Sequence, residues 1–294
     1  MTVRLGTNPI AWSNDDLREL GGATPLETCL SEAASAGYSG IELGHKFPRQ
    51  AAVLRPILDR HGLALVSGWY SSALLERDAE AEMIALRPHL ELLRGCGCEV
   101  LILAETSNAI HGDRTIPLSR RPVLTDPAWD VLAPRLSDLT GRVRSEGMTI
   151  AYHHHMGTVI QSEAEIDRLM ASTADSLTLL LDTGHATFAG ADPVGLARRY
   201  RGRISHVHCK DVRSAVMANV ADRDASFLDS VVDGVFTVPG DGGIDFAGVL
   251  AALPGYHGWL VVEAEQDPAK AHPLTYARIG HENLSRHAAR SGLL

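Results

Sequence analysis

Residues 177–182 read Leu-Thr-Leu-Leu-Leu-Asp, and the chain continues with Thr-Gly-His185. The run is too uniformly apolar for a strand with one face in water, because such a strand alternates polar and apolar side chains. It therefore predicts a strand that is buried on both faces, as in a parallel sheet. The run ends at a carboxylate, Asp182. Polar residues at the ends of otherwise apolar strands are the positions at which a site is expected.

The same kind of short apolar run recurs along the chain. Eight segments rich in Val, Ile and Leu are expected to be strands: 3–10, 39–43, 63–69, 98–104, 148–154, 177–182, 203–209 and 258–264. Between most of them lie stretches with helical spacing of apolar residues, for example 24–36, 49–61 and 78–94.

This alternation of strands and helices requires a parallel sheet, because each return to the sheet needs a crossover helix. Eight such units in 294 residues average about 37 residues each, and eight units close most economically into a (β/α)₈ barrel. An open doubly wound sheet is the alternative, but no GxGxxG motif follows the first strand. The sequence therefore predicts an α/β protein with a single TIM-barrel domain over residues 1–294.

Two connections are longer than the others, at about 105–125 and 211–243. Both leave the carboxyl ends of strands, which is the end of a barrel where active sites lie. Long loops in compact domains are usually functional, so these two are expected to border the mouth of the barrel. Residues 226–233 within the second loop are expected to form a short helix of their own.

Composition excludes several classes of protein. Apolar residues make up 45% of the chain and charged residues 21%, which is typical of a globular protein. No apolar run approaches the roughly 18 residues of a membrane span, and the first residues lack a secretory apolar block, so a soluble cytoplasmic protein is expected. The 27 basic and 36 acidic residues give a net charge of −9, which disfavours a nucleic-acid partner. The four cysteines form no CxxC…CxxC pattern and are expected to be reduced thiols.

Four consecutive predicted strands end in imidazole or carboxylate groups. The chain reads His153-His-His155, then Asp182-Thr-Gly-His185, then His206-Val-His-Cys-Lys-Asp211, and finally Glu263-Ala-Glu265. The intervals from His153 to Asp182 and from Asp182 to His208 are 29 and 26 residues, each about one βα unit. These side chains are therefore expected to meet at one mouth of the barrel.

Two imidazoles and two carboxylates are a donor set that suits a divalent ion such as Mn²⁺, Co²⁺ or Zn²⁺. Burying the groups together without a cation would be costly, which also favours a metal. Each residue has a simpler interpretation when taken alone. A single histidine can be a hydrogen-bonded core residue, Asp182 can cap the following helix, and Glu263 can pair with an arginine. Because side chains alternate along a strand, His153 and His155 are expected to face one way and His154 the other.

Several blocks of the chain resemble one known family. They are Asn8-Pro-Ile-Ala-Trp-Ser-Asn-Asp-Asp16, Gly40-Ile-Glu-Leu-Gly44, Ser67-Gly-Trp-Tyr70, Ala104-Glu-Thr-Ser107, Tyr152-His-His-His-Met-Gly-Thr158, Leu181-Asp-Thr-Gly-His-Ala-Thr187, His206-Val-His-Cys-Lys-Asp-Val-Arg213, Val238-Pro-Gly-Asp-Gly242 and Val262-Glu-Ala-Glu-Gln-Asp-Pro-Ala-Lys270. Together they resemble the metal-dependent TIM barrels of the xylose isomerase-like superfamily, and more closely the inosose dehydratases of inositol catabolism. The Asp-Thr-Gly-His and His-x-Lys-Asp blocks are shared across the superfamily, whereas the triple-His and Glu-Ala-Glu-Gln-Asp-Pro blocks are more specific to the dehydratases.

The resemblance implies a hydro-lyase that removes water from a cyclic polyhydroxy ketone, 2-keto-myo-inositol (scyllo-inosose). The implied product is a trihydroxycyclohexane-1,2-dione, reached through a metal-stabilised enolate. The implied metal ligands are His153, Asp182, His208 and Glu263, and the implied ion is Mn²⁺ or Co²⁺, with Mg²⁺ and Zn²⁺ as alternatives. The isomerase and epimerase branches usually carry Glu at the first of these positions. His153 therefore disfavours the proton exchange between two carboxylates on opposite faces of a substrate.

Further residues are expected to act on the substrate. The candidate catalytic residues are Glu263, His185 and His155. The candidate substrate-binding residues are Lys46, Trp69, Glu105, His111, Arg213 and Glu265. The expected partner is a small cyclitol, with no nucleic acid and no membrane, and the resemblance implies a homo-oligomer by analogy.

Three alternatives remain at this point. A ketose isomerase or epimerase would use the same metal and enolate. An endonuclease-like DNA repair enzyme shares the barrel and ligands, although it would need more ligands and a basic groove. A sugar-binding protein without catalysis is the third alternative.

Overall fold

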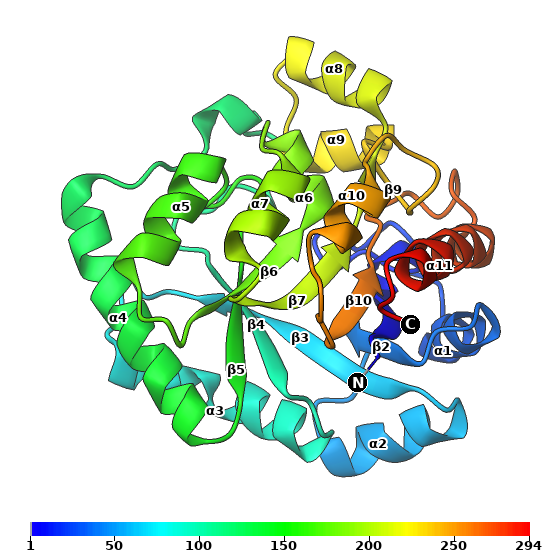
Figure 1. Ribbon diagram of the computed structural model, residues 1–294, viewed down its shortest axis with the longest axis horizontal. Coiled ribbons are helices and arrows are strands. Elements are labelled where there is room, and N and C mark those ends of the chain that lie inside the picture. Colours follow the sequence, from blue (N-terminus) through cyan, green and yellow to red (C-terminus); the bar gives the residue numbers. More distant parts are fainter. Residues whose placement is uncertain (1) are drawn as a thin grey trace.

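Eight parallel strands close on themselves to form a barrel (Figure 1). The structure is a computed structural model and describes residues 2–294. Around the barrel the strands follow the order β1-β10-β7-β6-β5-β4-β3-β2, and every neighbouring pair is parallel. Their bounds are β1 (Arg4–Thr7), β2 (Gly40–Leu43), β3 (Ala64–Ser72), β4 (Val100–Glu105), β5 (Thr149–His153), β6 (Thr178–Asp182), β7 (Ile204–Cys209) and β10 (Trp259–Val262). The predicted single TIM barrel is confirmed.

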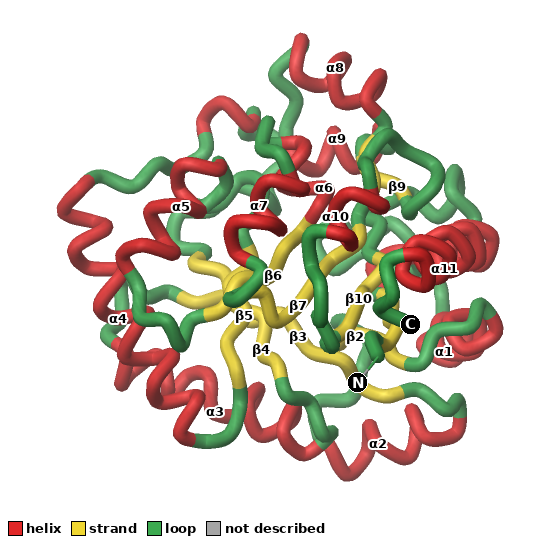
Figure 2. Tube along the Cα trace, viewed as in Figure 1, coloured by secondary structure: helices red, strands yellow, loops and turns green. Residues whose placement is uncertain are grey.

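Helices surround the barrel and cover its outer face (Figure 2). The helices of this outer layer are α1 (Leu26–Ser35), α2 (Ala51–Arg60), α3 (Ala79–Gly95), α4 (Asp126–Ser145), α5 (Glu163–Ser172), α7 (Pro193–Tyr200), α10 (Phe246–Ala251) and α11 (Pro273–Arg290). A further short helix, α6 (Thr183–Phe188), begins directly where β6 ends. The two ends of the chain meet beneath the barrel, where the backbone N–H of Val3 donates to the carbonyl of Leu293 at 2.9 Å.

The first strand is shorter than the apolar pattern of residues 3–10 predicts. Pro9 has no N–H to donate to a neighbouring strand, so the extended backbone ends at Thr7. A 3₁₀ helix, η1 (Pro9–Ala11), follows, and the Asn8 side chain caps it by accepting from the backbone N–H of Ile10 at 2.9 Å. This early end allows the segment after β1 to fold over the mouth of the barrel.

The interior of the barrel is packed with side chains and is not a pore. At the amino end, Val66 and Val261 pack around Trp259, and Gly40 leaves room for its indole. A Cβ at position 40 would lie only 2.6 Å from atoms of both Trp259 and Val66. Above this layer Ile102, Ala151 and Leu180 form a second apolar cluster. Most inward-facing polar side chains lie toward the carboxyl ends of the strands, although His206 is level with Leu180 in the pairing of β6 with β7. The apolar plug therefore forms the floor of the site.

The segment after β7 is more structured than the sequence predicts. Residues 226–233 form the expected helix, α9 (Phe227–Asp233), which Ser226 caps. The segment also contains α8 (Ser214–Asp222), which projects from the rim in Figure 1. Two short strands were not predicted, β8 (Asp211–Val212) and β9 (Phe236–Thr237), and they pair in an antiparallel hairpin. Strands of two residues give no hydrophobic period, so the sequence pattern carries no signal for them.

The two long connections pack against each other over one side of the barrel mouth. The segment after β4 contains a 3₁₀ helix, η2 (Leu118–Arg120). Beside it Pro117 forms an isolated antiparallel bridge with Ser226. Arg114 pairs with Asp229 at 2.6 Å. The predicted mouth loops thus form one continuous wall.

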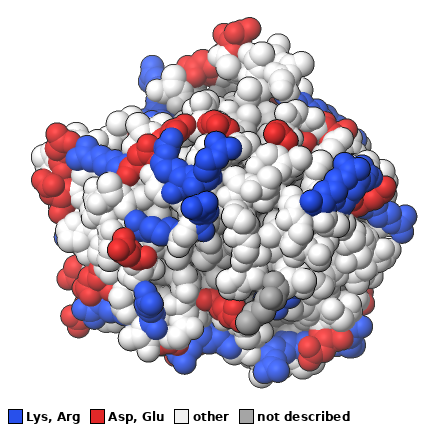
Figure 3. Space-filling model, viewed as in Figure 1, with Lys and Arg blue, Asp and Glu red and all other residues white. Residues whose placement is uncertain are grey.

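Charged side chains are mixed on the surface. On the face in view in Figure 3, lysines and arginines lie close to aspartates and glutamates, without an extended area of either sign. Among residues 2–294, no helix combines the length and apolar character that crossing a membrane requires.

Shortening Leu180 tests the importance of the apolar floor. Leu180 is completely buried inside the barrel, so Leu180→Ala leaves a cavity and should lower the free energy of unfolding by about 2–5 kcal/mol. Ile84→Ala is the control, because Ile84 is 71% exposed on α3 and should change stability by less than about 0.5 kcal/mol. Urea denaturation monitored by circular dichroism measures both, and equal stability of the two variants would contradict the assignment of the floor.

Candidate metal centre and active site

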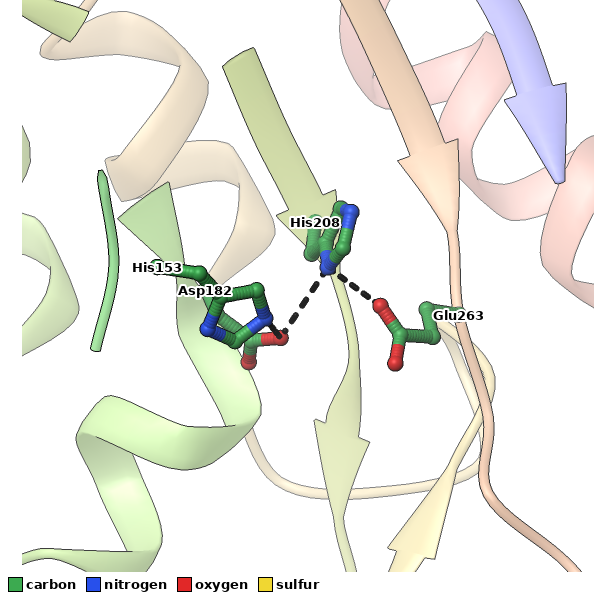
Figure 4. A group of neighbouring side chains, drawn as sticks. All are labelled: His153, Asp182, His208 and Glu263. Atoms are coloured by element: carbon green, nitrogen blue, oxygen red, sulfur yellow. Dashed lines mark ion pairs between the residues drawn. The ribbon is translucent and has the colours of Figure 1, made fainter. Parts of the chain in front are cut away.

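Four polar side chains meet at the carboxyl ends of four neighbouring strands (Figure 4). His153 ends β5, Asp182 ends β6, His208 is the last but one residue of β7, and Glu263 follows β10. One donor atom from each lies within 4.8 Å of the others, and all four residues are buried. Asp182 and His208 face each other directly in the pairing of β6 with β7. The strand order of the barrel thus produces the cluster.

Three atoms of this cluster are buried and have no hydrogen-bond partner within residues 2–294. They are Asp182 Oδ2, His208 Nδ1 and Glu263 Oε2. The Asp182 oxygen lies 3.4 Å from His208 Nδ1 and 3.6 Å from His153 Nε2, and His208 Nδ1 also contacts the Glu263 carboxylate. A buried polar atom without a partner costs about 1–3 kcal/mol, so several at one point indicate a missing ligand. Two imidazole nitrogens and two carboxylate oxygens fit a divalent ion such as Mn²⁺, Co²⁺ or Zn²⁺.

The other polar side-chain atoms of these four residues already have hydrogen-bond or ion-pair partners. His153 Nδ1 donates to the carbonyl of His154 at 2.8 Å, which leaves Nε2 without a proton and able to bind a metal. Asp182 Oδ1 accepts from the backbone N–H of His185 at 2.8 Å and so caps α6. One oxygen of Asp182 therefore caps the helix, and the other joins the cluster.

Glu42 supports this cluster and was not among the predicted site residues. It lies buried in β2, and its carboxylate accepts from His208 Nε2 at 3.1 Å and His206 Nε2 at 2.8 Å. Asn8 and Ser67 donate to it as well. Burial alone would raise the pKa of Glu42, but the two imidazoles hold it well below its usual value. The signal in the sequence is a single glutamate within the apolar run Gly40-Ile-Glu-Leu.

Lys210 is the second site residue that the prediction omitted. It is completely buried directly after β7, and its ammonium lies 3.0 Å from Glu263 Oε1 and 2.8 Å from Glu265 Oε2. It also contacts His185 Nε2 at 3.0 Å. Burial would lower the pKa of Lys210, but Glu263, Glu265 and Asp182 outweigh this effect and raise it. The signal was a lysine that directly follows a buried strand.

A pocket of about 200 Å³ opens next to the cluster. Four residues predicted to act on the substrate line it, in addition to Glu263: Trp69, His111, His155 and Glu265. Asn8, Asp15 and Asp16 line it too and come from the segment that follows β1. Burial raises the pKa of the Glu265 carboxyl to about 7, although Lys210 acts in the opposite direction. The pocket therefore contains a carboxyl group that can hold a proton near neutral pH.

His155 and His185 lie together on one side of the pocket. Their ring centroids are 3.9 Å apart, and Phe227 of α9 packs against both rings. His155 reaches the pocket, whereas His185 is completely buried behind it. Burial and the neighbouring histidines keep the pKa values of both rings well below the usual value, so both are neutral. His154 points out of the barrel, where its Nε2 accepts from the backbone N–H of Asp182 at 3.3 Å.

Three further predicted residues do not line the pocket. The Lys46 ammonium donates to the carbonyls of Gly21, Gly22 and Thr24, which holds the segment after β1 in place. Glu105 accepts from Ser72 Oγ and from the backbone N–H groups of Leu74 and Ser107. Arg213 donates to the carbonyls of Gly234 and Phe236 and pairs with Asp241 at 2.7 Å, and it thereby holds the hairpin of β8 and β9. The charged groups of these three residues bind backbone groups of neighbouring loops and so stabilise the loops.

Known proteins resemble the chain over almost its whole length. The family model for the xylose isomerase-like TIM barrel matches residues 30–287. The Rhizopine catabolism protein MocC of Rhizobium meliloti is 52% identical over 99% of this chain and 90% of its own. The inosose dehydratase of Geobacillus thermodenitrificans is 46% identical over 94% of each chain. A solved xylose isomerase domain protein from Planctomyces limnophilus superposes over the full length of both chains with a TM-score of 0.70 and 15% identity, which shows the shared fold alone.

Removing the charge of Glu42 tests its support of His208. In Glu42→Gln the amide no longer carries the negative charge that orients the ring and increases its basicity, so affinity for Mn²⁺ or Co²⁺ should fall about 10- to 100-fold. Isothermal titration calorimetry of the metal-free protein measures this. The matched control is Glu82→Gln, since Glu82 is equally buried but binds Tyr70 and Arg77 on the outer face. An equal loss of affinity in both variants would contradict a specific role of Glu42.

Proposed function

This chain belongs to the family of xylose isomerase-like TIM barrels, and on that basis we propose that it is a metal-dependent dehydratase of inositol catabolism. Its substrate in this proposal is 2-keto-myo-inositol, and its product is a trihydroxycyclohexane-1,2-dione. The observation that carries the proposal is the set of ligand atoms that His153, Asp182, His208 and Glu263 offer beside a polar pocket, three of them without a hydrogen-bond partner in residues 2–294. The inosose dehydratase at 46% identity supports the choice of substrate.

The loss of water requires removal of a proton from a carbon next to the ketone. This proton is too weakly acidic to leave unaided at neutral pH. A divalent ion held by the four ligands would supply Lewis-acid polarisation of the substrate carbonyl and so increase the acidity of that C–H group. The protein residues must then provide one base and one acid in the pocket.

His155 is the base in this proposal. Its Nδ1 must carry the ring proton, because this nitrogen faces the carbonyl of Met156 at 2.8 Å and a carbonyl can only accept. The other nitrogen, Nε2, is then free to accept a proton from the substrate carbon. His185 packs against the ring and holds its orientation, so we assign His185 a positioning role and not a contact with substrate.

Glu265 is the acid in this proposal. Its raised pKa, about 7, allows it to hold a proton at neutral pH, and it lines the same pocket as His155. It gives this proton to the departing β-hydroxyl, so the hydroxyl leaves as water while the electrons of the broken C–H bond form the C=C bond. The resulting enol becomes the dione by tautomerisation, and the proton on His155 returns to Glu265 through solvent.

Glu263 is less suited to be the base than a sequence comparison with epimerases suggests. Its Oε1 forms an ion pair with the Lys210 ammonium at 3.0 Å, and its Oε2 belongs to the four-residue cluster. Both oxygens therefore already have a role, and we assign Glu263 to the metal site. Trp69 and His111 line the pocket beside His155, with ring centroids 5.4 and 5.1 Å from that of His155.

A role in rhizopine catabolism is a second candidate, because the relative at 52% identity carries that name. The two candidates differ in the substrate that turns over, and the metal site would serve either. Comparing kcat/KM for 2-keto-myo-inositol with that for rhizopine under the same conditions distinguishes them. Isomerisation of a ketose without loss of water would instead support the isomerase or epimerase alternative.

Removal of the metal tests the proposed chemistry. Treatment with a chelator should abolish dehydration, followed as the ultraviolet absorbance of the dione, and Mn²⁺ or Co²⁺ should restore it. In His153→Ala both the metal content and kcat/KM should fall, the latter by about 100-fold or more, because one ligand is lost. Activity that persists in protein shown to be free of metal would refute the proposal.

His257→Ala is the matched control for the loss of a histidine. His257 is exposed and lies at the amino end of the barrel, directly before β10 and away from the mouth. Metal content and dehydration rate should therefore equal those of the unmodified protein. A similar loss in both variants would show that the effect of His153→Ala is not specific to the cluster.

A further inference from the structure

A second cluster of metal-binding side chains lies beside the first. His155, His185 and Glu265 each offer one donor atom, these atoms lie within 4.8 Å of one another, and all three residues are buried. Two imidazoles and a carboxylate are a sufficient donor set for a catalytic metal ion. From donor chemistry alone, this cluster would bind a second divalent ion.

The ammonium of Lys210 already lies among these donors. It is 3.0 Å from His185 Nε2 and 2.8 Å from Glu265 Oε2. These are hydrogen-bond distances, whereas a metal ion would lie about 2.0–2.2 Å from the same atoms. The second cluster therefore has the dimensions of a site for an ammonium group.

The fold fixes the ammonium in this position. Lys210 is the only lysine or arginine among the buried residues of the described chain, 2–294. Its aliphatic stem lies against Gly184, where a Cβ would come within 2.5 Å of the Lys210 Cγ. The ring of Phe236 in β9 covers the ammonium at 4.6 Å from its centroid. The ammonium is thus enclosed and has no path to solvent.

The charges of the surrounding residues explain why this buried region needs the Lys210 ammonium. They also explain why a second divalent ion does not bind beside that ammonium. Glu42, Asp182, Glu263 and Glu265 place four carboxylates in the same buried region. One divalent ion in the first cluster and the Lys210 ammonium together supply three positive charges. A second divalent ion about 3 Å from the ammonium would be strongly repelled, because like charges interact strongly where water is excluded.

We propose that the Lys210 ammonium takes the place of a second metal ion, so that the chain binds one divalent ion and the His155–His185–Glu265 cluster binds metal only when that ammonium is removed. This inference deepens the proposed function, since it specifies the number of ions in the proposed metal site. It also gives Lys210 a positioning role, because the same ammonium holds Glu263 and Glu265 beside each other.

The number of bound ions per chain tests the inference. The full chain is equilibrated by dialysis with Co²⁺, and bound metal is measured by mass spectrometry and by the visible absorption of the ion. Unmodified protein should bind one ion. Lys210→Ala removes the charge and opens the space, so it should bind two. Lys210→Met removes the charge but fills the space, so it should bind one. In Lys210→Ala/Glu265→Gln the second ion should be lost again.

Two results would overturn the inference alone. One is a folded Lys210→Ala variant, shown by circular dichroism, that binds only one ion. The other is an unmodified protein that binds two ions, the second of which disappears in Glu265→Gln. The second result is measured without any substitution at Lys210, so it tests the inference even if Lys210→Ala does not fold. An unmodified protein that binds no ion would overturn both the inference and the proposed metal-dependent function, whereas the first result leaves the latter intact.

Discussion

Buried negative charge at the mouth of the barrel is the constraint on which the arrangement of the site depends. Four carboxylates lie where little water reaches them, and each would be costly without a positive partner. The surrounding residues are those that can offset this charge. Glu42 has two imidazoles, Glu263 and Glu265 share Lys210, and Asp182 caps a helix with one oxygen. Within residues 2–294 the two buried carboxylate oxygens without a hydrogen-bond partner, Asp182 Oδ2 and Glu263 Oε2, both belong to the first cluster, which is why a cation fits there.

Barrel closure makes this concentration of charge possible. Glu42 and His208 are 166 residues apart in the chain and lie on β2 and β7, which are not neighbours in the sheet. They meet because inward-facing side chains of a closed barrel reach across its axis. The apolar floor of Ile102, Ala151 and Leu180 closes the barrel below them, so the polar groups can face only one another or the pocket. The fold thus determines which charges must be balanced together.

The sequence was informative where a residue's role depends on its own strand. The repeat of about one βα unit predicted the barrel, and the polar strand ends predicted His153, Asp182, His208 and Glu263 as neighbours, which the structure brings together. It was uninformative where a role depends on contacts across the barrel. Glu42 lies in an apolar run and Lys210 at the end of a strand, and nothing in their own segments indicates which imidazoles and carboxylates reach them from other strands. Lys46 and Arg213 illustrate the converse, because a charge near a strand end can be held by backbone carbonyls of a loop and not by the site.

The balance of buried charge also relates the presence of histidine at position 153 to the protonation of Glu265, the proposed acid. A glutamate in place of His153 would add a fifth carboxylate to the buried set, whereas histidine binds a cation without adding charge. In the proposed site, one divalent ion and the Lys210 ammonium leave the four buried carboxylates a single negative charge in excess. A proton on Glu265 removes that excess, and burial raises the pKa of this carboxyl to about 7. In the proposed function, this proton is the one that dehydration requires. In this way the same constraint that assembles the cluster also prepares its acid.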